Sequence, residues 1–351
     1  MDARTPPSEA WPEEDLERLG ACPACGSRER KTLFENLADQ LFGVAGRWTM
    51  HSCQGCGAAY LDPRPTDESI WRAYLNYHTH QSGGDYAPSS RQGFKARLCN
   101  GYLNSRYGHR LPGGLPLGRL ALALKPRSRR REDYSVRHLP APSAPGARFL
   151  DVGCGAGAFL PVAENLGYQA QGIDPDPEAV EAARALGRNV STGLLPNPDL
   201  APESYEQITF NHVLEHLPRP LETLIQAHHL LKPGGRIWLS QPNLQAIGLA
   251  RFGRDWRGLE PPRHLALFDK GSILKLLERA GFGRPKLLPA QLSAPFYFLH
   301  SYLLGIGENP YAARTAALPL MMRIEALAAD LAAQFNSTLG ESLTVIAFKA
   351  F

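Results

Sequence analysis

The stretch that decides the fold runs Arg148-Phe-Leu-Asp-Val-Gly-Cys-Gly-Ala-Gly157. Its first half, Arg148 to Val152, is a short apolar run that predicts a buried strand. Glycines follow at alternate positions and indicate a tight turn, because glycine lets the backbone turn sharply and lets a ligand approach it closely. Residues 158–166 then predict a helix. A strand, a glycine-rich turn and a helix in this order begin a βαβ unit.

An acid after the next predicted strand strengthens this interpretation. Residues 168–173 predict that strand, and Asp174 follows it, 23 residues after Asp151. A carboxylate there can hold both ribose hydroxyls of a nucleoside. The dinucleotide pattern reads G-x-G-x-x-G, and Ala158 takes the place of its last glycine, which that pattern sometimes allows. The dinucleotide interpretation does not explain the acid before the first glycine.

Strands and helices alternate along the rest of the chain. Further strands are predicted at residues 207–210 and 236–240, and helices at 178–186, 221–231 and 272–280. Residues 291–338 are apolar, aromatic and helical in pattern, and residues 341–351 predict a last strand. Such alternation is typical of a mostly parallel sheet with helices on both faces.

Four ordered motifs resemble those of class I methyltransferases that use S-adenosylmethionine (SAM). They are Leu150–Gly157, Gly172-Ile-Asp174, Asn211-His-Val-Leu-Glu-His216, and Leu231-Lys-Pro-Gly-Gly235 followed by Ile237–Ser240. The resemblance implies a Rossmann-like α/β fold, in which a seven-stranded sheet has an antiparallel last strand. It also implies SAM as the cofactor, with Asp174 at the ribose and Leu194 or Leu195 near the adenine. Its cofactor site further includes Asp151, Gly153 and Gly155 along the methionine part, together with Gly157 and Asn211.

Two cysteine pairs stand near the N-terminus. Cys22-Pro-Ala-Cys25-Gly26 and Cys53-Gln-Gly-Cys56-Gly57 are separated by 27 residues. Each pair turns the chain so that both thiolates face one ion, and the two pairs supply the four sulfurs of a tetrahedral Zn²⁺ site. Because four thiolates leave no open position for a substrate, we expect a structural zinc in a zinc ribbon. Nucleic-acid binding by this ribbon stays an alternative, although it has no cluster of Arg and Lys of its own.

The ribbon continues into Leu61-Asp-Pro-Arg-Pro-Thr-Asp67. The combination resembles methyltransferases with an N-terminal zinc ribbon, a group that includes sugar C-methyltransferases. The likeness covers residues 21–80 and 148–283. We therefore expect a disordered tail (1–20), the ribbon (21–62), a helical and basic connecting region (63–147) and the methyltransferase domain (148–351), with a helical insertion at 291–338.

Candidate catalytic residues follow the strand predicted at 207–210. Ligands of open α/β sheets bind at the carboxyl ends of the strands, and Glu215 and His216 lie just beyond this one. A base helps when the nucleophile is a hydroxyl or a carbon acid. On this hypothesis His216 is the base and Glu215 orients it or acts beside it. The alternative, weighted equally, is that both residues cap and pack the following loop.

A second segment, Pro261–Phe268, also resembles the pattern of this group. His264 is a further catalytic candidate that would face the acceptor, while a structural histidine is the slightly favoured alternative. Arg263 would bind an acidic acceptor or pair with a carboxylate. We interpret His212 as a packing residue rather than a neighbour of SAM.

Composition limits the class of protein. The chain has 351 residues, 43% apolar and 21% charged, and a net charge of +4, which are ordinary globular values. No apolar run reaches the ~18–20 residues of a membrane span. The acidic N-terminus does not resemble a secretory signal, and cysteine pairs of this kind indicate metal ligands in a reducing compartment, so we expect a cytoplasmic protein. From Arg91 to Arg137 twelve Lys and Arg face two acids, which predicts a solvated, mobile segment able to attract phosphates.

These observations predict a SAM-dependent methyltransferase that acts on a small molecule such as a sugar or a glycan precursor. One alternative is an RNA or protein methyltransferase that docks through the ribbon and the basic stretch. Another is a SAM-binding interaction protein without catalysis, against which the intact glycine loop and Asp174 argue. The acceptor atom and the oligomeric state are left open.

Overall fold

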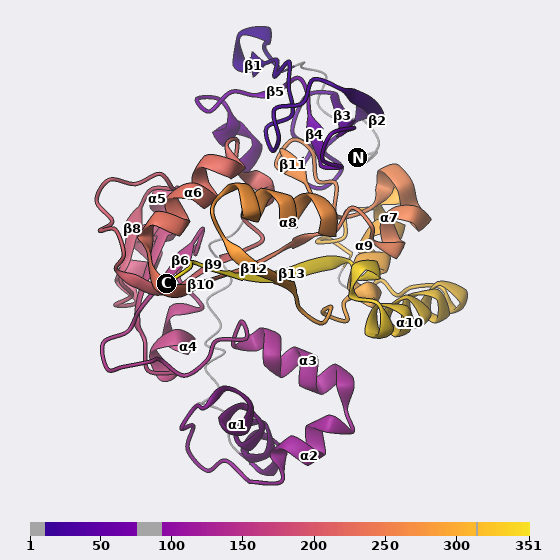
Figure 1. Cartoon of the computed structure of the whole chain (residues 1–351). Coiled ribbons are helices and arrows are strands. Elements are labelled where there is room, and N and C mark those ends of the chain that lie inside the picture. The colour runs from indigo at the N-terminus through magenta and orange to yellow at the C-terminus, as the bar shows by residue number, and fades with distance from the viewer. Residues whose placement is uncertain (1–10, 76–92, 314) are drawn as a thin grey trace.

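A seven-stranded sheet forms the centre of the computed structural model, which describes residues 11–75, 93–313 and 315–351 (Figure 1). The strand order is β12-β13-β10-β9-β6-β7-β8. The bounds are β6 (Arg148–Val152), β7 (Gln169–Asp174), β8 (Val190–Thr192), β9 (Tyr205–Asn211), β10 (Leu231–Pro242), β12 (Gly283–Leu287) and β13 (Ser342–Phe348). Strands β6 to β10 pair in parallel, and β13 is antiparallel to both β10 and β12. The predicted α/β sheet with an antiparallel last strand is confirmed.

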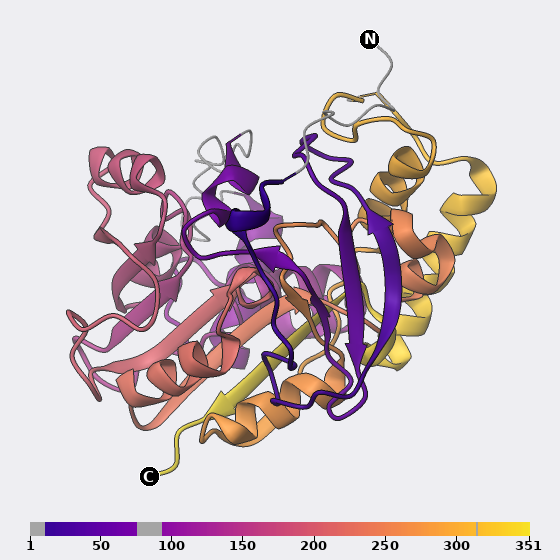
Figure 2. The same cartoon turned by 90° about the horizontal axis from the view of Figure 1, so that it is seen from above.

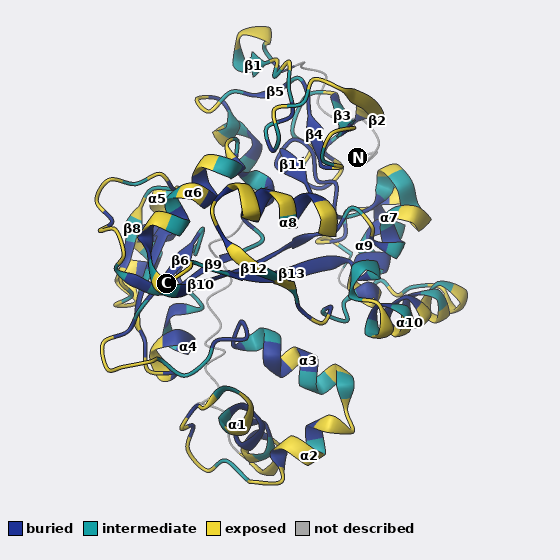
Figure 3. Ribbon diagram, in the orientation of Figure 1, coloured by how far each residue is buried: buried dark blue, intermediate teal, exposed yellow. Residues whose placement is uncertain are grey.

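Side chains that alternate along each strand divide the core into two layers. Phe149 packs with α4 (Leu160–Asn165) and α5 (Pro177–Ala185) on one face. Leu150 packs with α6 (Pro220–Leu230) and α8 (Lys270–Arg279) on the other. The central strands are buried from both sides (Figure 3). Because both faces are covered, the glycine loop after β6 opens only at the carboxyl edge of the sheet, where ligands of such sheets bind.

Two strands of this sheet were not predicted from the sequence. Strand β12 reads Gly-Arg-Pro-Lys-Leu, lies at the sheet edge and is mostly exposed, so it has no alternation of apolar residues to reveal it. Strand β8 has three residues. In addition, Pro233-Gly-Gly235, a sequence typical of a turn, lies within β10, where the pairing with β9 shifts register between Leu231 and Arg236. Residues that break a regular ladder can thus still belong to a strand.

A second sheet, of order β11-β4-β3-β2, forms the N-terminal ribbon. It consists of β2 (Arg30–Leu37), β3 (Trp48–Cys53), β4 (Ala59–Leu61) and β11 (Ala266–Leu267). Strand β11 comes from the other half of the chain and pairs with β4. Seen from above, the ribbon lies over the central sheet (Figure 2). The ribbon and the large domain therefore share a sheet.

Residues 11–20 differ from the expected disordered tail. They form η1 (Glu13–Asp15) and β1 (Leu16–Glu17), which pairs with β5 (Arg64–Pro65). The Trp11 side chain is buried against Trp48, with ring centroids 5.3 Å apart. This aromatic contact accounts for the order, because burying an indole offsets the entropy lost by the segment. Residues 1–10 lie outside the described residues.

The connecting region forms η2 (Ile70–Tyr74), α1 (Phe94–Tyr107), α2 (Gly118–Ala123) and α3 (Pro126–Ser135). Most described Lys and Arg of its basic run are exposed, as predicted, but Arg130 is buried and donates to the carbonyls of Ala290 at 2.9 Å and Gln334 at 2.8 Å. These acceptors lie beside α9 (Ala294–Gly305) and α10 (Leu320–Phe335), which precede η7 (Ser337–Leu339) and β13. The run therefore ties the connecting region to the C-terminal helices.

The remaining elements are η5 (Leu214–His216), α7 (Ile247–Phe252) and η6 (Gly253–Asp255). No helix within the described ranges has both the length and the apolar character needed to cross a bilayer.

A buried ion pair joins the ribbon to the large domain. Arg263 is fully buried, and its Nη2 and Nη1 lie 2.7 and 2.9 Å from the two carboxylate oxygens of Asp39. Its Nε donates to Glu260 at 2.9 Å, and its Nη1 donates to the carbonyl of Ala73 at 3.0 Å. Of the two roles expected for Arg263, pairing with a carboxylate is the one observed. Charges this deeply buried are stable only while every partner is present.

We predict that Asp39→Ala lowers the free energy of unfolding by about 3–5 kcal/mol, because it leaves a buried guanidinium without one of its carboxylates. Urea denaturation followed by circular dichroism measures the loss. The control is Glu325→Ala, which removes a pair with Arg251 whose side chains are 43% and 42% exposed and should cost about 0–1 kcal/mol. Equal losses in the two variants would contradict the structural role of the buried pair.

Candidate functional site

The glycine loop after β6 requires glycine at two positions for different reasons. Gly153 has a φ of 66°, and a Cβ there would lie 2.5 Å from the Val213 side chain. Gly155 has a φ of 54°, and a Cβ there would meet no atom within 4 Å. The backbone at Gly155 therefore borders open space that a ligand can fill. Gly157, with a φ of 69°, completes the turn into α4.

Asp174 stands beside this loop at the end of β7. Its Oδ2 accepts the backbone N–H of Gly155 at 2.6 Å, and its Oδ1 accepts that of Asp176 at 3.0 Å. Burial raises the pKa of Asp174, and the two backbone hydrogen bonds oppose that shift. The carboxylate is therefore held in place at the carboxyl edge of the sheet, next to the open space at Gly155. This arrangement fits the ribose of a nucleoside.

The two leucines expected near an adenine follow closely. The Gly193 N–H donates to the Asp174 carbonyl at 2.9 Å, so the chain after β8 passes next to the acid. Leu195 is buried and Leu194 is partly buried in the same core cluster. Both residues thus follow the strand next to Asp174 and pack in the core beside it.

Asp151 accepts a hydrogen bond from Arg137, which the sequence analysis did not select as a site residue. Its Oδ1 accepts from Thr209 Oγ1 at 2.9 Å and from Nη1 of Arg137, whose guanidinium also lies 3.9 Å from the centre of the Phe159 ring. The other oxygen of Asp151 is buried, and no hydrogen bond reaches it from the described residues. Arg137 is the last residue of the basic run. The run therefore supplies the positive charge that compensates the carboxylate of Asp151.

Asn211 ends β9 and contacts the connecting region. Its Oδ1 accepts from the Tyr134 hydroxyl of α3 at 2.7 Å, and that hydroxyl lies 3.4 Å from Ser240 Oγ of β10. Helix α3 is therefore fastened to the carboxyl ends of two neighbouring strands.

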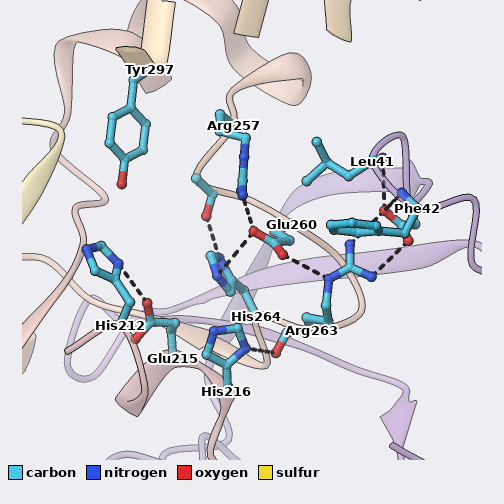
Figure 4. A network of polar contacts seen from close by, with 12 residues as sticks. Leu41, Phe42, His212, Glu215, His216, Arg257, Glu260, Arg263, His264 and Tyr297 are labelled. Atoms are coloured by element: carbon cyan, nitrogen blue, oxygen red, sulfur yellow. Dashed lines mark hydrogen bonds and ion pairs between the residues drawn. The ribbon is translucent and has the colours of Figure 1, made fainter. Parts of the chain in front are cut away.

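A cavity of about 220 Å³ opens beside these strand ends (Figure 4). Its walls come from the segment after β9, from residues 257–264 and from α9. The lining residues are His212, His216, Pro242, Arg257, Gly258, Glu260, His264, Phe296 and Tyr297. The cavity combines imidazoles with aromatic rings, and pockets for small molecules commonly join a few polar groups with apolar walls.

The structure brings the two predicted histidines together in this cavity. The rings of His216 and His264 have centroids 4.7 Å apart. His216 Nδ1 lies 3.0 Å from the Arg263 carbonyl and 3.0 Å from the Tyr74 hydroxyl, and His264 Nδ1 lies 2.7 Å from the Gly258 carbonyl. Because a carbonyl oxygen only accepts, each Nδ1 carries the proton and each Nε2 keeps its lone pair.

Burial disfavours the charged form of both of these imidazoles. It is the largest effect on each and lowers the pKa of His216 below its usual value and that of His264 to about 4. Glu260 lies 3.7 Å from His264 Nε2. However, that carboxylate is shared by Arg257 and Arg263, so little of its charge is available to an imidazolium.

Glu215 lies within 4.8 Å of His216, as expected, and of His264, but it also contacts His212. Its Oε1 lies 3.3 Å from Nδ1 of His212. Glu215 is fully buried, and neither of its oxygens has a well-aligned hydrogen bond within the described residues. Burial would raise the pKa of Glu215, but the neighbouring histidines, His212 first, hold it below its usual value.

The sequence analysis named His212 but did not place it in a pocket. It lines the cavity with a side chain that is 35% exposed, whereas we interpreted it as a packing residue. A histidine three residues before a glutamate, just past a strand that ends at a ligand site, was the available signal. That signal is weak, because only the backbone of the following turn decides whether the two side chains meet.

The four knuckle cysteines converge in the ribbon. Their sulfurs all lie within 4.8 Å of one another, with Cys22 and Cys56 at 3.8 Å and Cys25 and Cys53 at 3.4 Å. All four are free thiols rather than disulfides. Sulfurs bound 2.3 Å from a tetrahedral zinc lie about 3.8 Å apart. The cluster therefore has the donor set and nearly the spacing of a structural zinc site, and it can hold a zinc ion.

Residues 125–283 match the model of a protein family described as a methyltransferase domain. Among curated proteins, the ubiquinone biosynthesis O-methyltransferase of Xanthomonas campestris pv. campestris (strain B100) is 40% identical over 135 residues, which are 36% of this chain and 55% of the relative. That of Xanthomonas axonopodis pv. citri (strain 306) is 38% identical over 136 residues, with the same coverage. The chain spans about half the length of these relatives.

Solved structures overlap this fold in part. A SAM complex of phosphoethanolamine N-methyltransferase 2 from Haemonchus contortus is 14% identical, covers 84% of this chain and 63% of its own, and has a TM-score of 0.43. A SAM-dependent methyltransferase from Archaeoglobus fulgidus is 20% identical, with a coverage of 65% and 93% and a TM-score of 0.41.

The family match includes the glycine loop, Asp174 and the segment from Asn211 to His216. Together with the observed strand order, it shows that this part of the chain is a methyltransferase domain of the class I, SAM-dependent type.

Proposed function

We propose that this protein transfers the methyl group of SAM to a small molecule bound in the histidine-lined cavity. The observation that carries the proposal is the place of that cavity, at the carboxyl ends of β9 and β10 and directly after Asn211. The matched relatives are named as O-methyltransferases of ubiquinone biosynthesis, which supports a small acceptor. A sugar or a glycan precursor is the more specific hypothesis, and it rests on the sequence resemblance alone.

In this proposal the glycine loop and its neighbours hold the cofactor. Asp174 binds the ribose hydroxyls, Leu194 and Leu195 pack at the adenine, and the buried free oxygen of Asp151 accepts from the ammonium group. Gly153, Gly155, Gly157 and Asn211 shape the rest of the site. The cofactor supplies an electrophilic methyl group on a sulfonium.

The catalytic residues that we propose are His216, His264 and Glu215. The Nε2 lone pairs of the two histidines accept hydrogen bonds from the acceptor and orient it, while the carboxylate of Glu215 favours arrival of a proton in the cluster. Phe296 and Tyr297 border the same space and exclude water from it. Methyl transfer is a direct displacement, so alignment and the exclusion of water contribute much of the rate.

A nucleic-acid or protein acceptor has less support. Arg130 and Arg137 of the basic stretch are buried and unavailable for docking, although most of its other described Lys and Arg are exposed. We further propose that the protein works in the cytoplasm, where a reducing environment keeps the four ribbon cysteines available as thiolates.

We predict that SAM and S-adenosylhomocysteine bind in titration calorimetry and that Asp174→Ala weakens both by about 10–100-fold, the worth of one or two hydrogen bonds to a charged group. The control is the exposed Asp199→Ala, which should leave the affinity unchanged. Binding of NAD without binding of SAM would overturn the cofactor assignment.

Elemental analysis should find one zinc per chain in the purified protein. Cys22→Ser should remove most of the metal and destabilise the ribbon, because metal binding is coupled to folding in such modules. Cys99→Ser removes a buried thiol outside the cluster and should leave the zinc content unchanged. Wild-type protein that holds no zinc or other thiophilic metal would refute the site.

The test of the function itself is transfer of a labelled methyl group. The purified protein is incubated with methyl-labelled SAM and a panel of phenols, polyols and nucleotide-linked sugars, and we expect label in at least one acceptor. His216→Ala and His264→Ala should each lower this transfer, by as much as about 10²–10⁴-fold if the histidine also accepts the proton. Binding of SAM without transfer to any member of the panel would favour the non-catalytic interaction protein.

A further inference from the structure

The residue after β9 has an unusual backbone. His212 has a φ of 55°, in the left-handed region, which is uncommon for residues other than glycine and costs roughly 1–3 kcal/mol. Its N–H donates to the Ser240 carbonyl at 2.8 Å, so the ladder with β10 holds the conformation. The result is that the imidazole lies on the cavity wall, immediately after the proposed cofactor residue Asn211 (Figure 4). Strain of this kind gathers at functional sites.

Behind His212 lies a buried carboxylate whose charge has no arginine or lysine partner among its described contacts. Glu215 Oε1 is 3.3 Å from His212 Nδ1. A carboxylate at Nδ1 selects the tautomer with the proton on Nδ1 and leaves the Nε2 lone pair toward the cavity. Hydrogen bonds of catalytic groups are often long in ligand-free enzymes and tighten when the substrate binds. The spacing therefore fits a histidine oriented by an acid.

Glu215 also lies within 4.8 Å of the other two cavity histidines, His216 and His264, but in the described residues its ion-pair contact is with His212. The Nδ1 atoms of His216 and His264 face neutral backbone carbonyls. The carboxylate nearest to His264, that of Glu260, is already shared by two arginines. A proton on His212 would form a direct ion pair with Glu215, whose Oε1 is 3.3 Å away, whereas the other two rings lie outside such a contact in the described part of the chain.

We propose that His212, oriented by Glu215, is the group that takes the proton of the acceptor. The inference rests on the proposed function and assigns its proton-transfer step. As the acceptor atom bonds to the methyl carbon, the methyl–sulfur bond breaks and its electron pair stays on sulfur. The acceptor proton moves to His212 Nε2, the imidazolium pairs with Glu215, and the proton then leaves to water. His216 and His264 remain neutral and orient the acceptor.

The test substitutes His212 by Asn, which tolerates the left-handed backbone. With the best acceptor of the panel, His212→Asn should lower transfer by about 10²–10⁴-fold and leave SAM affinity within about threefold. Added imidazole should restore part of the rate, which a purely structural defect would not allow. Glu215→Gln should give a smaller loss. His229→Asn, at an exposed position on α6, is the matched control and should retain full activity.

A second measurement does not depend on finding an acceptor. Nitrogen-15 NMR of the protein with S-adenosylhomocysteine should show His212 protonated at Nδ1 in the wild type, and Glu215→Gln should increase the fraction protonated at Nε2. Wild-type His212 protonated mainly at Nε2 would overturn the proposal. So would near-normal transfer by His212→Asn when His216→Asn abolishes it. If the wild type binds SAM but methylates nothing, the proposed function fails instead, and the NMR result still decides the tautomer.

Discussion

The arrangement of the site depends on the ion pairs that the Arg263 guanidinium forms. It is fully buried and binds Asp39 of the ribbon on one side and Glu260 of the cavity wall on the other. The backbone carbonyl of the same residue contacts His216 Nδ1. One residue therefore joins the ribbon, the charge balance of the cavity and the tautomer of a proposed catalytic histidine. Because a buried charge tolerates no missing partner, these three features are coupled energetically.

The central sheet could be predicted from the sequence because its inner strands are short apolar runs bounded by glycine and charged residues. Strands β6, β10 and β13 carry that signal, and the glycine loop marks where the chain leaves β6. Strand β12 could not be predicted, since an edge strand needs no apolar face. The burial of Arg130 was equally hidden, because its partners lie about 160 and 200 residues away along the chain and only the folded chain brings them near.

The candidate site likewise has features that could be predicted from the sequence and features that could not. The cysteine cluster and the loop with Asp174 follow from local spacing, since their partners are close in sequence or repeat a motif. The meeting of His216 with His264 was not predicted, because its geometry depends on backbone carbonyls from the segment between β10 and α8. The contacts of His212 and of Arg137 come from a left-handed residue and from a buried arginine, neither of which leaves a pattern in the sequence.

The pairing of β11 with β4 makes the ribbon inseparable from the rest of the protein. Strand β11 follows His264 by one residue, so the ribbon supplies the neighbouring strand for the segment that carries this histidine. A variant that lacks the first seventy residues would expose the unpaired edge of β11 to solvent. An unpaired edge of this kind promotes aggregation. The ribbon is thus not an independent domain. A chimaera with a different ribbon would have to keep the edge of β4 that pairs with β11, so that the histidine-lined cavity stays intact.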